Sequence, residues 1–320
     1  MLNRMLFLCL AETLLRMGFT RMLPEDTLEK YRRAGEIAAK VREEMKRKTR
    51  EGMPIIQICE ESEEKIRNMG GSPAFPCNVS VNEIAAHYTS PPGDEKQVPA
   101  GALVKIDVGA HVDGYIADTA TTVCFNPEYE AMVRTAEEAL ETAVKIIRPG
   151  LSFSRFGSEI QKVIELHGFK PISNLTGHQV GHYMIHAGKS LPNVAHFSIN
   201  KIQEGEVYAI EPFVTLKQAA GRVEDGPQSF IFRFVKRRPL KQPEAKNLLK
   251  FVETNFKTLP FAERWLKAYD TSSRHKSVFH DLISSKCLMT YPVFVEASRQ
   301  YVAQAEHTVY VEKDGAVVLT

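Results

Sequence analysis

The chain has 320 residues, of which 43% are hydrophobic, and a formal net charge of +2. It can bury a sizeable core, as one large domain with an insert or as two domains, and the charge balance excludes a bulk polyelectrolyte partner. No apolar run approaches the roughly 20 residues that a membrane span needs. The cysteines are odd in number, form no C-x-x-C pair and favour buried thiols in a reducing cytoplasm: Cys9, Cys59, Cys77, Cys124 and Cys287.

The first 22 residues, which begin MLNRMLFLCLAETLL, resemble a secretion signal only in part. Arg4 precedes a short apolar core, but Glu12 follows it at once and no convincing small-residue cleavage site is present. We therefore expect a helical N-terminal extension over 1–22, or an upstream start codon, rather than secretion.

The following part of the chain repeats itself at a constant offset of 98 residues, which aligns Gly52 with Gly150 and Gly70 with Gly168. Each copy predicts an amphipathic helix, a basic-then-glycine break, a second helix and then strands. Any two amphipathic helices align weakly by chance, but shared glycines at one offset argue against chance. Two similar α-plus-β halves that face each other would leave a cleft between their sheets.

The segment KIDVGAHVDGYIADTATTV, residues 105–123, predicts a hairpin that turns at Asp113-Gly114. Two registers are open, with Asp107 and Asp118 either diagonal or directly opposite, and both place the two carboxylates on one face. Two ionised carboxylates among apolar neighbours repel each other unless one is protonated or a cation lies between them. A metal is the better interpretation, and an edge hairpin with both side chains in water is the alternative.

The second half of the chain contains further metal-binding residue types. NLTGHQVGHYMIHAGKSLPN has three histidines, and two strand-like segments, VYAIEPFV and YVAQAEHTVYVEKDG, are each interrupted by a glutamate. Taken singly, each residue has an ordinary interpretation as a turn, surface or solvated strand residue. Taken together, two Asp, two Glu and one His form an oxygen-rich set that suits a pair of divalent ions. The histidines of these segments are His178, His182 and His186, and the glutamates are Glu211 and Glu306.

These motifs resemble the pita-bread metallopeptidases and, within them, type 2 methionine aminopeptidases of the archaeal kind. The matching segments are NEIAAHYTSPPGD, KIDVGAHVDGYIADTATTV, NLTGHQVGHYMIHAGKSLPN, VYAIEPF and QAEHTVYVEKDG, and weaker similarity extends from about Leu23 to the C-terminus. The resemblance implies an α+β pita-bread fold with pseudo-twofold related halves, central antiparallel sheets covered by helices, and a small helical insertion subdomain. It also implies removal of the N-terminal methionine from nascent proteins and peptides, with a preference for a small second residue.

The resemblance further assigns roles to single residues. Two divalent ions (Co, Mn, Fe or Zn) would be held by Asp107, Asp118, His178, Glu211 and Glu306. Glu211 would also shuttle a proton, His87 would hydrogen-bond the scissile amide, and His186 would stabilise the oxyanion-like intermediate. Phe75 corresponds to an aromatic wall of the methionine pocket, so Phe75, His87 and His186 would contact the substrate. His182 corresponds to no assigned position and is interpreted as structural or peripheral.

Glu211 and Glu306 are 95 residues apart, which favours the type 2 subfamily, whose helical insertion lies between them. Three stretches, PEAKNLLKFVETNF, PFAERWLKAYD and RHKSVFHDLISSKCL, predict short helices. We expect an extension over 1–22, a catalytic domain over 23–228 and 291–320, and the insertion over 229–290. An Xaa-Pro dipeptidase or aminopeptidase of the same fold stays open, although such enzymes generally carry a large N-terminal domain. So does a non-catalytic pita-bread binding protein, against which the intact ligand set argues.

Charge is distributed unevenly along the chain. Residues 229–290 contain thirteen basic and five acidic residues, so this segment has a charge of +8 and the remainder −6. The asymmetry favours a patch that faces a polyanion, and the run FRFVKRRPLK predicts a ribosome or RNA contact for an enzyme that acts on nascent chains. The alternative is a solvated basic face without a partner. We expect a monomer with no membrane association.

Overall fold

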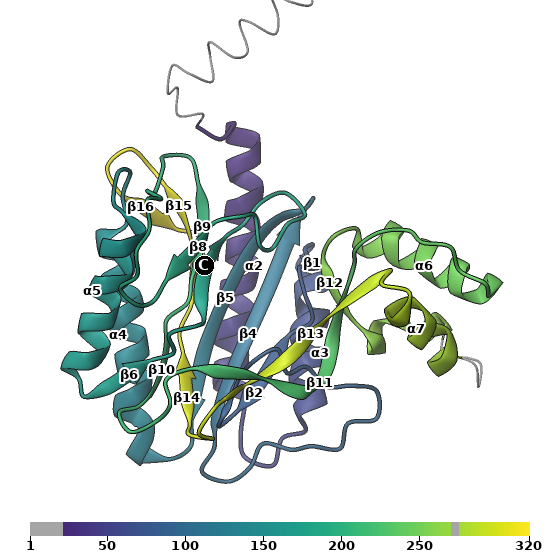
Figure 1. Cartoon of the computed structure of the whole chain (residues 1–320), viewed down its shortest axis with the longest axis horizontal. Helices are drawn as coiled ribbons and strands as arrows, with labels where there is room; N and C mark the ends of the chain where they lie inside the picture. The colour runs from purple at the N-terminus through teal and green to yellow at the C-terminus, as the bar shows by residue number, and fades with distance from the viewer. Residues whose placement is uncertain (1–21, 270–274) are drawn as a thin grey trace, which may run out of the picture.

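The computed structural model describes residues 22–269 and 275–320, so the predicted extension over 1–22 lies, except for its last residue, outside the described residues. The first half of the molecule contains two helices followed by five strands (Figure 1). They are α2 (Glu25–Lys48), α3 (Ile55–Asn68), β1 (Ser72–Pro73), β2 (Asn78–Val81), β3 (Ile84–Ala86), β4 (Leu103–Val112) and β5 (Tyr115–Cys124).

The second half repeats this order of elements. It contains η1 (Pro127–Tyr129), α4 (Glu130–Ile146), α5 (Phe153–Leu166), β6 (Phe169–Pro171), β7 (Thr176–Gln179), β8 (Ser190–Pro192), β9 (Val207–Ile210) and β10 (Phe213–Leu216). The offset of 98 residues carries α3 onto α5 and β2 onto β7, from the first residue to the last. Gly70 and Gly168 end the two equivalent helices with φ values of 84° and 81°, a left-handed conformation that favours glycine. The predicted repeat is therefore also a structural repeat.

The rest of the chain forms the insertion and the closing strands. It contains β11 (Val223–Phe234), α6 (Pro243–Phe256), β12 (Pro260–Ala262), η2 (Glu263–Tyr269), α7 (His275–Ser284), β13 (Leu288–Glu296), β14 (Val302–Gln304), β15 (His307–Val311) and β16 (Ala316–Val318). The helices predicted at either end of the insertion are present as α6 and α7. The helix predicted over PFAERWLKAYD is wrong at its start, because Phe261 pairs with Phe232 of β11 and only the 3-10 turn η2 follows.

All strand pairs in the described residues are antiparallel, and they form four sheets. In the first half, Ile37 and Val41 of α2 pack on Val104 and Val108 of β4. In the second half, α4 and α5 cover the sheet that contains β9 and β15. The helices therefore cover the sheets in each half, as the predicted fold class requires.

The insertion has a small core of its own, in which Leu248, Val252, Phe261 and Leu282 are buried. Positions 229 and 290 lie inside β11 and β13, so the strands run on from the catalytic part into the insertion. The division of the chain at these two positions stays a prediction.

The β4–β5 hairpin has the first of the two registers predicted from the sequence. Asp107 faces Ala120 and Gly109 faces Asp118, so the two aspartates are diagonal neighbours. The turn residues Asp113 and Gly114 have φ values of 51° and 88°, as a type I′ turn requires.

Two negative expectations from the sequence concern membranes and disulfides. Within the part of the chain that the structure describes, no helix combines the length and the apolar character of a membrane span. The described cysteines, which are Cys59, Cys77, Cys124 and Cys287, are free thiols, and Cys9 lies outside the described residues.

Candidate metal centre

The structure brings the five predicted ligands to one cavity of about 70 Å³ between the two halves. Each ligand comes from a different segment. Asp107 lies on β4, Asp118 on β5, His178 on β7, Glu211 directly after β9, and Glu306 between β14 and β15. A larger groove of about 860 Å³ lies between α3 and the insertion and shares Pro260 with this cavity, but it contains none of the five ligands.

Backbone contacts between the halves fix two of these side chains. The Ala120 and Glu306 backbones exchange hydrogen bonds of 3.4 and 3.1 Å. The Thr308 hydroxyl accepts from the Asp118 N–H at 2.7 Å and donates to the Asp118 carbonyl at 2.8 Å. Since all four groups are buried, Asp118 and Glu306 are held at a rigid seam between β5 and β15.

The ligand atoms are close to one another. His178 Nε2 lies 3.6 Å from Asp118 Oδ2 and 3.5 Å from Glu211 Oε1. Asp118, His178 and Glu306 each offer one ligand atom within 4.8 Å of the other two. Asp107 Oδ1, Asp118 Oδ1 and Glu306 Oε2 are buried without a hydrogen-bond partner among the described residues. A buried acceptor without a partner is costly, so these oxygens are free to bind a cation.

Burial and mutual repulsion change the pKa values of these groups. Burial raises the pKa of Asp107 from 3.8 to about 7. The pKa values of Asp118, Glu211 and Glu306 are raised well above their ordinary range, first by burial and then by the neighbouring carboxylates. Burial lowers the pKa of His178 to about 3, so its imidazole is neutral at neutral pH. Four carboxylates can be ionised together here only if a cation compensates them.

This donor set fits a divalent metal. Four carboxylates and one neutral imidazole form a hard, oxygen-rich set that Mn, Fe, Co and Zn all accept. Asp107, Asp118 and Glu306, which carry the unpaired oxygens, all line the cavity. The ligand assignment itself stays a prediction.

His87 lies after β3 in a left-handed backbone conformation, with φ 65°. Such strain in a non-glycine residue persists where the surrounding structure enforces it, and it is concentrated at functional sites. His87 Nδ1 donates to the Pro292 carbonyl at 3.2 Å, and the ring packs on Phe294 at 4.4 Å. Burial lowers the pKa of His87 to about 4. The imidazole is therefore neutral, with its Nε2 as a hydrogen-bond acceptor.

The structure separates the other predicted residues into two groups. His186 and Phe75 line the cavity, where the His186 ring lies 4.5 Å from that of His178. Phe75 packs against Gly109, since a Cβ at that position would lie 2.2 Å from Phe75 Cε1. His182 lies outside the cavity and its Nε2 donates to the Asp113 carbonyl at 2.8 Å. This hydrogen bond links the loop that contains His182 to the turn between β4 and β5.

The sequence prediction missed several residues that line the cavity or contact its ligands. Asn78 Nδ2 lies 3.4 Å from Asp107 Oδ2, and Gln304 Nε2 lies 3.4 Å from Glu211 Oε2. Gln304 stands two residues before Glu306, and in the strand-like segment YVAQAEHTVYVEKDG this spacing predicts a shared face. Ile231 and Tyr291 come from β11 and β13 and complete the wall. No sequence pattern distinguished these two from ordinary core residues.

Residues 29–313 match the family described as metallopeptidase family M24. The chain belongs to metallopeptidase family M24. Among its M24 relatives, the methionine aminopeptidase of Methanothermobacter thermautotrophicus is 46% identical over 296 residues, which cover 92% of this chain and 98% of the relative. The methionine aminopeptidase of Methanocaldococcus jannaschii is 42% identical over 292 residues, with coverage of 91% and 98%.

The same M24 fold is seen in a crystal structure of methionine aminopeptidase from Thermotoga maritima. It superposes with a TM-score of 0.68 at 23% identity and covers 94% of this chain and 99% of that one. An identity this low shows the fold alone. The predicted family and the predicted pita-bread fold are confirmed.

Proposed function

We propose that this chain removes the N-terminal methionine from peptides and nascent proteins by metal-assisted hydrolysis. The predicted enzyme class, a methionyl aminopeptidase and metallo-exopeptidase, is confirmed by the M24 family and by archaeal relatives that are 40% to 46% identical. The observation that carries the chemistry is a cluster of four carboxylates, of which Asp118 and Glu306 are buried, and one neutral imidazole in a small cavity.

Use of a divalent metal follows from the family. That two ions bind is our proposal, and their ligands would be Asp107, Asp118, His178, Glu211 and Glu306. When bound in such a site, divalent ions lower the pKa of water and polarise the scissile carbonyl. The donor set accepts Co, Mn, Fe or Zn, and availability usually decides which one is used.

The protein's own groups would move and hold the protons. Glu211 would take a proton from the attacking water and deliver it to the leaving amine. Because Nδ1 of His87 already donates to Pro292, its Nε2 would accept a hydrogen bond from the scissile amide N–H. His186 at the rim of the cavity would hydrogen-bond the developing oxyanion.

Substrate selection would depend on the size of the cavity. Phe75 offers an apolar wall for the unbranched methionine side chain, whose flexible thioether packs well against aromatic rings. The cavity measures only about 70 Å³, and His186 forms part of its wall. A bulky second residue would collide with this wall, so we expect a preference for small second residues.

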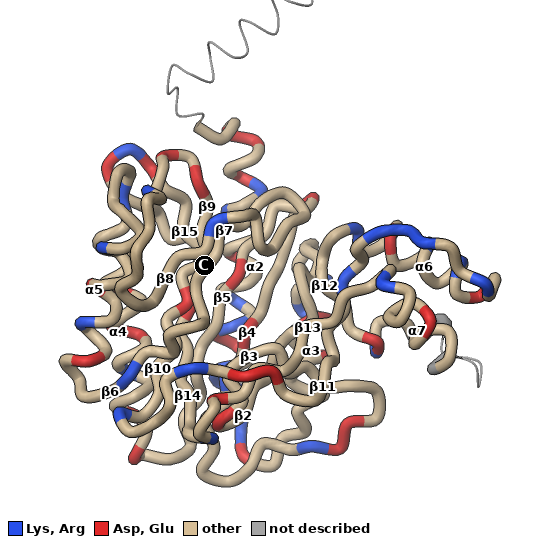
Figure 2. Tube along the Cα trace, viewed as in Figure 1, with Lys and Arg blue, Asp and Glu red and all other residues tan. Residues whose placement is uncertain are grey.

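A contact with ribosomal RNA would bring the enzyme to nascent chains. Lys and Arg gather between β11 and α6 (Figure 2), where Lys236, Arg237 and Arg238 are exposed. A groove of about 510 Å³ there is lined by Arg237, Arg238, Lys246 and Lys250. Cosedimentation with ribosomes should be salt-sensitive. If changing Lys236, Arg237 and Arg238 together to Glu leaves it unaltered, the patch is a solvated basic face.

Peptide turnover tests the proposed activity. With a divalent metal added, the purified protein should release methionine from Met-Ala-Ser much faster than from Met-Pro or Xaa-Pro peptides. Turnover of Xaa-Pro peptides alone would favour a prolidase. No turnover with Mn, Fe, Co or Zn would favour a non-catalytic binding protein.

A further inference from the structure

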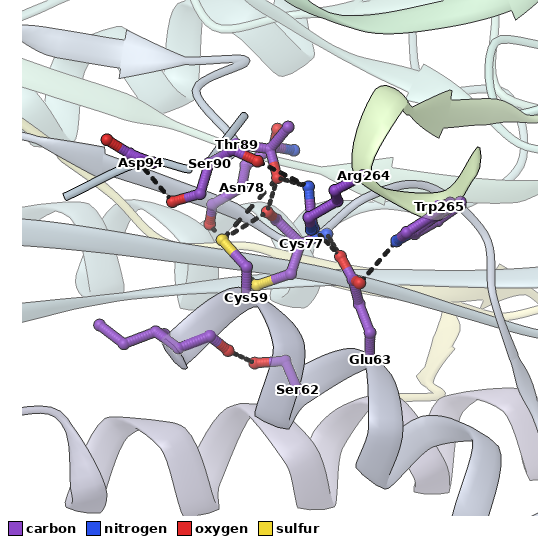
Figure 3. Close-up of polar contacts among 11 residues, drawn as sticks. Cys59, Ser62, Glu63, Cys77, Asn78, Thr89, Ser90, Asp94, Arg264 and Trp265 are labelled. Carbon is purple, nitrogen blue, oxygen red and sulfur yellow. Dashed lines mark hydrogen bonds and ion pairs between the residues drawn. The ribbon is translucent and has the colours of Figure 1, made fainter. Parts of the chain in front are cut away.

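A buried polar cluster joins the insertion to the wall of the active-site cavity (Figure 3). We call it the Arg264 cluster, and it consists of Arg264, Glu63, Cys77, Thr89 and Ser90. All five residues are at most 3% exposed. Arg264 lies on η2 of the insertion, four residues after Pro260, which itself lines the cavity. The other four belong to the first half of the molecule.

Arg264 uses both ends of its guanidinium fork. Its Nη1 donates to the Thr89 hydroxyl at 2.8 Å and to the Ser90 carbonyl at 3.1 Å. Its Nη2 pairs with the Glu63 carboxylate on α3, whose second oxygen accepts from Trp265 Nε1. Thr89 and Glu63 are 175 and 201 residues away in the sequence. One side chain therefore links three distant segments.

The backbone N–H and the carbonyl of Cys77 are both hydrogen-bonded to residues that also bond to Arg264. Its N–H donates to Glu63 Oε1 at 3.0 Å, and its carbonyl accepts from the Thr89 hydroxyl at 2.7 Å. Figure 3 shows these contacts converging on Cys77 from α3 and from the segment after His87. Any displacement of the guanidinium would move both supports of this peptide.

The segments fixed in this way carry the substrate-facing residues. Cys77 precedes Asn78, which contacts Asp107, and it stands two residues after Phe75. Thr89 stands two residues after His87. Phe75, Asn78 and His87 line the same cavity. A shift of η2 would therefore move two parts of the cavity wall, the one that contains Phe75 and Asn78 and the one that contains His87.

Stability alone does not account for this arrangement. A buried ion pair can be replaced by apolar residues of similar volume at little or no cost in stability, whereas removal of one partner is strongly destabilising. Burial raises the pKa of the Glu63 carboxyl, and Arg264 acts in the opposite direction. What an apolar pair could not supply is the planar fork that holds three acceptors at fixed spacing.

We propose that Arg264 is a positioning residue for recognition of the substrate's first side chain. Its fork sets the spacing between the Phe75–Asn78 segment and His87, so that the insertion defines the width of the methionine pocket. The inference rests on the proposed methionine aminopeptidase function, and it adds a residue that contacts neither the substrate nor the predicted ligands.

Substitutions at Thr89 test the proposal with little change in volume. Thr89→Val removes the hydroxyl that links Arg264 to Cys77, and Thr89→Ser keeps it. Arg264→Lys keeps the charge but not the fork. We expect the ratio of kcat/KM for Met-Ala-Ser to that for Leu-Ala-Ser to fall about tenfold in Thr89→Val. A factor of ten corresponds to about 1.4 kcal/mol, which is within the cost of one lost buried hydrogen bond. Arg264→Lys should show a similar fall, and Thr89→Ser should match the wild type.

Further measurements separate positioning from loss of structure. Bound metal and the folded fraction should be unchanged in Thr89→Val, because the predicted ligands lie on other segments. Arg67→Gln is the matched control, because Arg67 packs over the Trp265 ring at 5.7 Å and has no hydrogen bond to Thr89 or Cys77. It should keep the wild-type substrate ratio.

The outcomes for the two proposals differ. Suppose that the wild type releases methionine and that the Thr89→Val and Arg264→Lys variants have the wild-type substrate ratio. This result would overturn the positioning role and leave the proposed function intact. A metal-loaded wild type without methionine release would overturn both.

Discussion

Asp107→Asn should stabilise the metal-free protein while abolishing its activity. The substitution conserves shape and removes a carboxylate that burial makes costly to ionise. Asn78 Nδ2, 3.4 Å from Asp107 Oδ2, can still donate to the new amide oxygen. The predicted gain comes from the cost of ionising a buried carboxyl group, which a bound cation would otherwise offset.

The pKa of Asp107 gives the size and sign of the effect. Its rise from 3.8 to about 7 in the folded state corresponds, at about 1.4 kcal/mol per pKa unit, to a cost of about 4 kcal/mol once the group is ionised. Below about pH 4 the raised pKa of Asp107 does not change the free energy of unfolding. As the pH rises to about 7, Asp107 lowers that free energy by the full cost of ionising it. The variant should therefore gain about 4 kcal/mol at pH 8 and about 2 kcal/mol at pH 5.

Urea unfolding of chelator-treated protein, followed by far-UV circular dichroism at both pH values, measures this difference. Asp113→Asn is the matched control on the same hairpin, since Asp113 is exposed at the turn and Asn is equally suited there. It should show no pH-dependent gain. The reasoning would be refuted if Asp107→Asn were less stable than the wild type at pH 8. It would also be refuted if the substitution changed the free energy of unfolding by the same amount at both pH values. Added metal should stabilise the wild type more than the variant.

Three further substitutions test separate parts of the site. Glu306→Gln should abolish methionine release and lower the bound metal in a folded protein, and full activity would contradict its role as a ligand. His87→Ala should reduce kcat by on the order of 10²-fold with unchanged metal content, as expected for loss of acid–base assistance; loss of metal instead would mean that His87 is a ligand. Gly109→Ala should raise KM for methionyl peptides, because its Cβ would lie 2.2 Å from Phe75 Cε1 and displace that ring. An unchanged KM would show that Phe75 does not form the pocket wall.

The repeat made much of the fold predictable from the sequence. Helix breaks at Gly70 and Gly168 need a left-handed conformation, and this local requirement is visible in the sequence. The Asp113-Gly114 turn left two registers for the hairpin, and the structure has the one in which Asp107 and Asp118 are diagonal neighbours. The start of the predicted middle helix of the insertion failed because Phe261 pairs with Phe232, a tertiary contact that overrides local helical spacing.

The candidate site was predictable where residue type and strand spacing carried the signal. Asp107 and Asp118 could be placed on one face from the pairing arithmetic of a single hairpin. The contact of Arg264 with Glu63 could not be predicted from the sequence. The two residues are 201 positions apart, and nothing local distinguishes a buried arginine from a solvated one. The charge asymmetry of the insertion counted Arg264 among its basic residues, yet this side chain is buried and paired.

Metal titration of the chelator-treated enzyme tests the central claim most directly. Methionine release from Met-Ala-Ser should be absent without metal and should rise with added Mn, Fe, Co or Zn. It should saturate as the ions bound, counted by elemental analysis, approach two per chain. Methionine release that persists at full rate in metal-free protein would contradict the account.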